Sequence, residues 1–173
     1  MAYAPVPLET ANLMPADEFI EVFGDVAEHS PWVAEDAAAR RPYASREAMI
    51  AAFQAAIGEA GADRQHELLR QHPDLAGKAA MAGALTEDSA REQAGAGLDR
   101  LSAEEFERFT ALNAAYRARH GIPFILAVRG ATKDDILAAF EQRSGNTPEE
   151  ELVGALEQVC RIVRFRIEDR VSE

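Results

Sequence analysis

The 173-residue sequence contains one cysteine, Cys160, so no disulfide can form within the chain. Cys160 lies in a helical pattern of apolar residues, where a lone cysteine is typically a small, reduced core residue. A domain of this length buries roughly 70 % of its unfolded surface, so it needs neither a disulfide nor a structural metal for its stability. We therefore expect residues 1–173 to form a single domain that resides in the cytoplasm.

Long hydrophobic runs are also missing, although 47% of the residues are apolar. No run approaches the ~20 apolar residues that a membrane-spanning helix requires. The first residues, MAYAPVPLET, lack the basic-then-apolar order of a secretory signal, and the last, DRVSE, match no peroxisomal or lipid-anchor signal. These absences predict a protein that is not bound to a membrane.

Basic residues are scarce relative to acidic ones. The chain has 18 Lys and Arg against 30 Asp and Glu, which gives a formal net charge of −12. Such a surface repels nucleic acid and anionic membranes at long range, so neither is an expected partner. A few arginines can still make one local pocket positive, and an anionic small-molecule substrate therefore stays compatible with this composition.

The sequence also lacks the common motifs for metals, nucleotides and activated nucleophiles. Its four histidines are scattered, no HExxH occurs, and one cysteine cannot build a zinc site. There is no P-loop, no GxGxxG between a strand and a helix, and no GxSxG elbow. We expect a protein that works without a metal and without a cofactor.

Helical periodicity dominates what is present. Apolar residues recur at intervals of three and four in most segments, which predicts an all-α fold: a single compact helical domain of about eight helices with no sheet. The expected helices are 14–28, 30–40, 45–60, 62–72, 86–101, 102–121, 132–143 and 147–171. The last of these carries an apolar stripe at Leu152, Leu156, Cys160, Val163, Ile167 and Val171.

Capping residues mark several of these helix ends. Ser30 and Thr86 are expected N-caps, and Ser102 with Glu105 has the spacing of a capping box. Gly121 is the expected end of the helix that begins after Ser102.

Residues 121–130, GIPFILAVRG, do not fit a helix, because this apolar run contains a proline and is bounded by glycines. No second strand is available to pair with it, so we expect an extended, buried connector. Its buried backbone groups need hydrogen-bond partners, and a bound ligand is one possible source.

Two groups of polar residues are candidates for chemistry. His72 directly precedes Pro73, and a proline disfavours helix in the residue before it, so the ring should lie where a helix ends. Ser89, Glu92 and Gln93 have the i, i+3 and i+4 spacing that places side chains on one helix face. The simpler readings are a histidine that interacts with the helix dipole and an ordinary solvated face. Spacing alone does not exclude them.

Arginines of the last expected helix form a third candidate group. A planar guanidinium can bind a polar ligand through two parallel hydrogen bonds. Periodicity does not choose between Arg164, Arg166 and Arg170, since all three lie beside the apolar stripe.

Five segments, in order, resemble the OHCU decarboxylase family, whose substrate is 2-oxo-4-hydroxy-4-carboxy-5-ureidoimidazoline (OHCU). They are HSPWVAE, HPDLAGK, SAREQAGAGL, LNAAYRARHGIPFILAVRG and RFRIEDRV, and the resemblance as a whole extends over about residues 8–171. The resemblance implies an all-α, cofactor-free carboxy-lyase that forms (S)-allantoin and CO2 in the last step from urate, within purine metabolism. It also implies a homodimer, and the missing peroxisomal signal suggests a bacterial, cytoplasmic form.

Carried over residue by residue, the resemblance implies two catalytic groups, His72 and Glu92. The implied substrate-binding residues are Pro73, Ser89, Gln93, Phe124, Ile125 and Arg166. The ligand-facing segment that the resemblance implies consists of Pro123, Phe124 and Ile125. The resemblance thus selects Arg166 among the arginines that periodicity left open.

Two other functions stay in competition. A non-catalytic helical binding module could use the acidic surface to recruit a basic partner, but it would not need the residues around His72. A hydrolase earlier in the same pathway lacks a visible nucleophile or metal-ligand set.

Overall fold

The computed structural model describes residues 4–77, 80 and 82–173. Lys78, the last residue of the HPDLAGK segment, lies outside the described residues. The chain divides into two compact units, a first unit of Met1–Gln71 with Val159–Glu173 and a second unit of His72–Gln158. Helix α10 (Pro148–Arg170) begins in the second unit and ends in the first.

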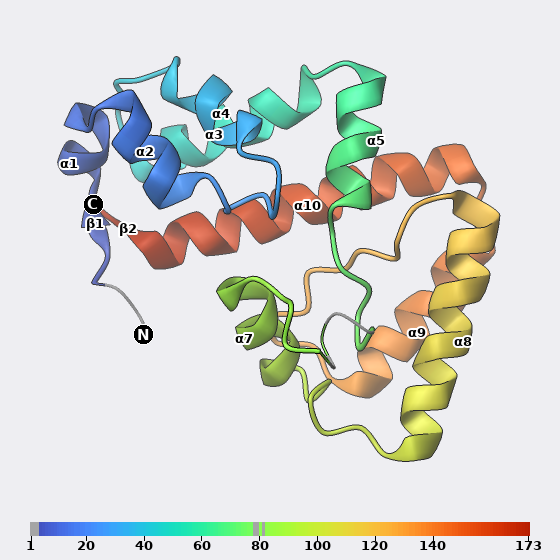
Figure 1. Cartoon of the computed structure of the whole chain (residues 1–173). Helices are drawn as coiled ribbons and strands as arrows, with labels where there is room; N and C mark the ends of the chain where they lie inside the picture. The colour runs from blue at the N-terminus through green and yellow to red at the C-terminus, as the bar shows by residue number, and fades with distance from the viewer. Residues whose placement is uncertain (1–3, 78–79, 81) are drawn as a thin grey trace. The chain divides into compact units, whose positions relative to one another are not determined.

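The first unit is built mainly from short helices (Figure 1), and aromatic side chains lie in its core. Its helices before the unit boundary are α1 (Leu8–Leu13), α2 (Ala16–Phe23), α3 (Trp32–Ala38), α4 (Arg46–Gly58) and α5 (Ala62–Arg70). The rings of Phe19 and Phe23 lie 4.7 Å apart, and Phe53 of α4 lies within 6.5 Å of both. These buried rings join α2 to α4.

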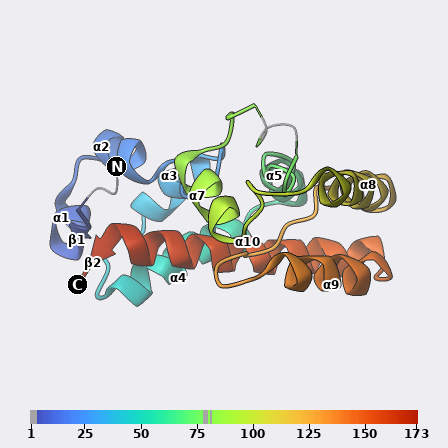
Figure 2. The same ribbon diagram turned by 90° about the horizontal axis from the view of Figure 1, so that it is seen from below.

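The second unit contains α7 (Glu87–Gly95), α8 (Ala103–His120), α9 (Lys133–Ser144) and the beginning of α10. Phe109 of α8 and Phe140 of α9 have ring centroids 6.1 Å apart. Both views show α8 and α9 as neighbours (Figure 1, Figure 2). The aromatic core of this unit therefore lies against α8 and α9.

The all-α prediction is confirmed, since nine helices account for most of the described residues. One difference is a small parallel pairing of β1 (Val6–Pro7) with β2 (Val171–Ser172), both in the first unit. A strand of two residues has no measurable alternation, so the sequence carried no signal for it. Among the described residues, no helix is long and apolar enough to cross a membrane.

Most of the expected helix ends are found where the capping residues indicated. Thr86 accepts a hydrogen bond from the Ser89 N–H, Ser102 and Glu105 form the expected capping box, and Gly121 ends α8 with a φ of 70°. Ser30 is the exception, because α3 begins at Trp32 and Pro31 occupies the N-cap position. Helix α7 is also shorter than expected and ends at Gly95.

The buried face of α10 is rotated from the stripe that the sequence indicated. In its first half the buried side chains are Glu151, Ala155 and Val159, whereas Leu152, Leu156 and Cys160 are only half-buried. Val163, Ile167 and Val171 are buried as expected. The pattern of apolar residues placed the buried face of α10 one residue too far toward the C-terminus. Neither the buried Glu151 nor the small Ala155 stands out in a search for large apolar residues.

Candidate active site

His72 lies directly after the end of α5, as the following proline predicted. The helix ends at Arg70, and its C-cap residue Gln71 donates its backbone N–H to the Glu67 carbonyl. The His72 side chain is 5% exposed, so it is a buried group rather than a solvated ring at a helix end. Pro73, which the resemblance also places in the site, is half-buried beside it.

The residues after Pro73 form a tight turn held from two helices. Gln93 of α7 accepts the Ala76 N–H at 3.0 Å, and its amide nitrogen lies 3.4 Å from the Asp74 carbonyl. Asn113 of α8 donates to the Leu75 carbonyl at 2.8 Å. Three consecutive residues of the turn are therefore bound by two side-chain amides.

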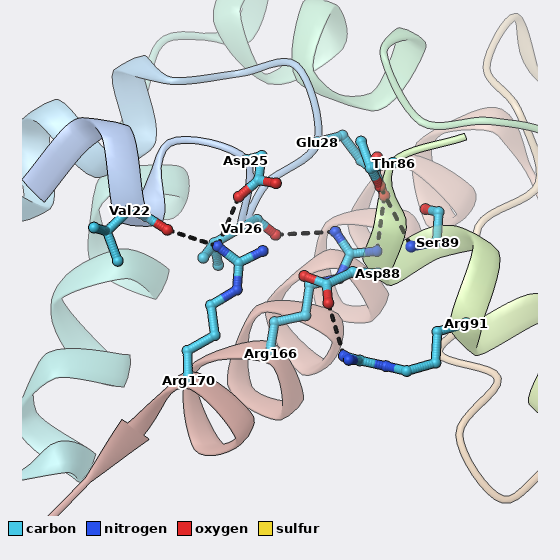
Figure 3. A network of polar contacts seen from close by, with 10 residues as sticks. All are labelled: Val22, Asp25, Val26, Glu28, Thr86, Asp88, Ser89, Arg91, Arg166 and Arg170. Carbon is cyan, nitrogen blue, oxygen red and sulfur yellow. Dashed lines mark hydrogen bonds and ion pairs between the residues drawn. The ribbon is translucent and has the colours of Figure 1, made fainter. Parts of the chain in front are cut away.

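Helix α7 presents Ser89 and Gln93 on its buried side, at 5% exposure each, and the neighbouring Glu92 is half-buried. The capping bond from Ser89 to Thr86 and the ion pair from Arg91 to Asp88, at 2.7 Å, order its first turns (Figure 3). The shared face that the spacing predicted is thus confirmed for the serine and the glutamine.

The connector at residues 121–130 is extended and mostly buried, as the sequence predicted. Arg143 of α9 donates to the Ile125 carbonyl at 2.6 Å, and the Ala127 N–H donates to Gln158 of α10 at 3.0 Å. Side chains of the protein, rather than a ligand, satisfy these two backbone groups.

Aromatic contacts fix the side chain of Phe124. Its ring stacks on Phe140 at 3.7 Å, meets Tyr116 edge-on at 5.1 Å and is covered by the guanidinium of Arg143 at 4.4 Å. Phe124 and Ile125 are 1% and 3% exposed. Phe124 and Ile125 therefore belong to the packed interior of the second unit.

A buried carboxylate that the sequence did not indicate joins the groups packed around Phe124. Glu151 accepts hydrogen bonds from Tyr116 at 2.6 Å, from Arg143 at 2.9 Å and from Asn146 at 2.9 Å. Burial raises the pKa of Glu151, but these donors more than offset it, so its pKa is lowered. The cluster therefore stabilises the folded state at pH values above the ordinary pKa of glutamate. This contribution is lost as the pH falls through the lowered pKa of Glu151.

Tyr116 belongs to the same cluster, and its pKa is raised, chiefly by burial and then by its hydrogen bond to Glu151. The pKa of the neighbouring His120 is lowered by burial. Both groups are therefore neutral at pH 7. In the sequence this cluster is visible only as polar residues at core positions of α8 and α10. A search for periodic apolar residues does not detect them.

Arg166 lies in the first unit and is 1% exposed. It donates to the Val26 carbonyl at 3.1 Å and to Glu28 at 2.8 Å, and Glu28 is itself 2% exposed (Figure 3). The two other candidates are more exposed: Arg164 pairs with Glu47, and Arg170 with Asp25. Burial thus separates Arg166 from the arginines that periodicity could not distinguish.

The second unit contains seven of the eight residues that the resemblance implied, namely His72, Pro73, Ser89, Glu92, Gln93, Phe124 and Ile125. The amide of Gln93 links α7 to the turn after His72. Helix α8 contacts that turn through Asn113 and the Phe124 ring through Tyr116. Within residues 4–77, 80 and 82–173, no three His, Cys, Asp or Glu side chains gather as metal ligands would.

Comparison with known proteins matches residues 12–168 to a family model described as OHCU decarboxylase. A 2-oxo-4-hydroxy-4-carboxy-5-ureidoimidazoline decarboxylase of Haloferax volcanii is 40% identical over 165 residues, which cover 95% of this chain and 96% of that protein. A protein of the same name from Amia calva is 39% identical over 168 residues, with 95% and 94% covered.

A solved structure is also similar along nearly the whole chain. A crystal structure of (S)-allantoin synthase matches with a TM-score of 0.76 and 34% sequence identity. The match covers 97% of this chain and 54% of that one, so this chain corresponds to about half of the solved protein.

Proposed function

The chain belongs to the OHCU decarboxylase family, and from this membership we infer that it is a carboxy-lyase that converts OHCU to (S)-allantoin and CO2. This reaction belongs to urate degradation, within purine metabolism. The observation that supports the proposal most strongly is identity of 40% along 96% of a relative that bears this name.

The chemistry of OHCU is compatible with a site that is built from side chains alone. The carbon that carries the carboxylate is next to a ring C=N, so the electron pair of the breaking C–CO2 bond moves into the ring. The ring nitrogen takes up a proton, and an enol remains. That enol loses its hydroxyl proton and gains a proton at the ureido-bearing carbon, which gives allantoin. No external electron sink is required.

We assign His72 and Glu92 to these proton movements. Histidine suits proton transfer near neutrality because its ordinary pKa lies between those of carboxylates and amines. Supporting this role, His72 is buried and the turn that follows it is bound by Gln93 and Asn113. In one arrangement His72 takes the hydroxyl proton and Glu92 helps to deliver the carbon-bound one. In the alternatives the two roles are exchanged, or Glu92 only orients the imidazole.

Ser89, Gln93, Pro73, Phe124 and Ile125 are proposed to bind the substrate. The hydroxyl and the amide supply hydrogen bonds to its polar groups, while the proline, phenylalanine and isoleucine form apolar contacts. The Gln93 amide already holds the turn, yet each amide oxygen accepts two hydrogen bonds and each amide nitrogen donates two. One side chain can therefore serve both purposes.

The activity is expected to be independent of metals. The purified protein, dialysed against a chelator, should consume freshly generated OHCU and release CO2 as fast as the untreated protein, and faster than the spontaneous reaction. An assay of OHCU absorbance with and without protein measures this. A chelated protein that became inactive and recovered with zinc or manganese would contradict the cofactor-free mechanism, and no acceleration by either sample would contradict the proposed function.

Arg166 is also proposed to bind substrate oxygens, away from the scissile carboxylate, since holding that charge in the ground state would oppose its loss as CO2. Replacing Arg166 by lysine keeps the charge but removes the planar pair of donors. We expect kcat/KM to fall about tenfold or more. This corresponds to the loss of one hydrogen bond to a charged group, which contributes about 1.5–3 kcal/mol. Steady-state kinetics of Arg166→Lys measure it.

The matched control for this variant is Arg164→Lys. Arg164 lies two residues away and pairs with Glu47 at 2.6 Å on an exposed surface. It should retain wild-type kinetics. Equal kcat/KM for Arg166→Lys and wild type, or a loss in Arg164→Lys alone, would assign the substrate contact to a different arginine.

Domain organisation, oligomeric state and location complete the proposed function. We propose one functional domain over residues 1–173, a homodimer and a location in the bacterial cytoplasm. The family resemblance supports the dimer, and the single cysteine suits a reducing compartment. Light scattering at micromolar concentration tests the dimer, and the mass of a single 18.8 kDa chain would contradict it.

A further inference from the structure

The turn that follows His72 has an unusual backbone for its sequence. Ala76 has a φ of 54°, in the left-handed region that residues with a side chain rarely adopt. Gly77 comes next, and a Cβ there would meet the Cβ of Asp74 at 2.8 Å. Such a turn does not keep its shape through local preference, so surrounding groups must hold it.

Two buried side-chain amides, one from α7 and one from α8, bind the backbone of this turn. Gln93 of α7 accepts the Ala76 N–H, and Asn113 of α8 donates to the Leu75 carbonyl at 2.8 Å. Arg117, one turn further along α8, donates to the Asp74 carboxylate at 2.8 Å, but this pair lies at the surface. The buried bonds dominate, because water competes poorly for them.

Asn113 is the one buried residue of α8 that has no aromatic ring. Its neighbours on that face are Phe109 and Tyr116, and Asn113 is 7% exposed. The helix is capped at both ends, by the Ser102 capping box and by Gly121. Asn113 therefore projects a hydrogen-bond donor from a rigid support onto the turn.

We propose that Asn113 is a positioning residue for His72. By binding the Leu75 carbonyl it sets, together with Gln93, the course of the turn from Asp74 to Gly77. Pro73 restricts the backbone between that turn and His72, so a displacement of the turn is passed on to the imidazole. This inference rests on the proposed catalytic role of His72.

The test replaces Asn113 by aspartate and, separately, by alanine. Aspartate has the same shape but turns an oxygen toward the Leu75 carbonyl, and alanine removes the donor without adding charge. In both variants we expect kcat to fall about 10–100-fold with KM within about threefold of wild type, as misplacing a catalytic group by about 1 Å does.

The matched control is Asn12→Asp in the first unit. Asn12 makes the same kind of bond, donating to the Tyr43 carbonyl at 3.0 Å and accepting the Tyr43 N–H at 2.7 Å. It should lose thermal stability to a similar degree but keep kcat within about twofold, since it holds a turn that carries no catalytic group. An equal loss of kcat in Asn12→Asp would show a general effect of stability and overturn the proposal.

A second readout does not depend on turnover. The imidazole resonances of His72, assigned by their absence in His72→Ala, should shift in both Asn113 variants and stay in place in Asn12→Asp. If wild type fails to turn over OHCU, the proposed function falls while these resonances still test the positioning. Unchanged His72 resonances or normal kcat in a folded Asn113→Ala would overturn it. So would failure of both variants to fold, which would make Asn113 a stability residue only.

Discussion

Replacing His72 by alanine should lower kcat/KM for OHCU by about 10²–10⁴-fold, the usual effect of losing a general acid or base. The side chain is 5% exposed and is followed by a turn bound from α7 and α8, and alanine supplies no group that could move the proton in its place. The rate of OHCU consumption, corrected for the spontaneous reaction, measures the effect.

A histidine outside the proposed site provides the control. His29 is exposed and lies in the first unit, so His29→Ala should keep wild-type activity. Circular dichroism and the Tm establish that His72→Ala is folded. If folded His72→Ala retained more than about a tenth of the wild-type kcat/KM, the assignment of His72 as an acid–base catalyst would be wrong.

Glu92→Gln should reduce kcat strongly, by about 10²-fold or more, with KM less affected. Glutamine keeps the shape of the side chain and removes both the charge and the ability to move a proton. If the enol is then protonated by solvent, the allantoin should also lose optical purity. Steady-state kinetics combined with the circular dichroism of the product measure both effects.

Glu87 of the same helix is the matched control for this charge change. It is exposed in the first turn of α7, and Glu87→Gln removes the same charge without touching the buried face. It should react at the wild-type rate and give optically pure product. Normal kcat and undiminished optical purity in Glu92→Gln would remove Glu92 from the mechanism and leave His72 to act alone.

The parts of the fold that were predicted correctly are those with local causes. A capping box at Ser102, a cap at Thr86 and a glycine at residue 121 each act within one helical turn, so neighbouring residues suffice to locate them. The proline after His72 acts locally as well. The same reasoning found the extended connector, because its proline and flanking glycines disfavour a helix.

The errors arose where tertiary packing overrides the local pattern. In α10 the face turned inward contains Glu151 and Arg166, whose burial depends on partners far along the chain, Tyr116 and Glu28. A search for apolar residues passes over both. It therefore selected Leu152 and Leu156, which are half-buried.

In the candidate site, too, local features were predicted from the sequence and long-range contacts were not. Spacing put Ser89 and Gln93 on one face and Pro73 fixed the place of His72, but only the family resemblance assigned their roles. Asn113 was missed because a single asparagine in a helix has no pattern of its own. The role proposed for Asn113 depends on its hydrogen bond to the turn, and that contact joins residues 38 positions apart.

The most direct test of the central claim, that this chain decarboxylates OHCU with a directed protonation, is the optical activity of the allantoin formed. OHCU should be generated freshly and divided among wild type, His72→Ala and buffer, with circular dichroism followed through the reaction. We expect wild type to give (S)-allantoin quickly and in optical excess, and the other two samples to give racemic product slowly. Racemic allantoin from all three samples at the same rate would contradict the account.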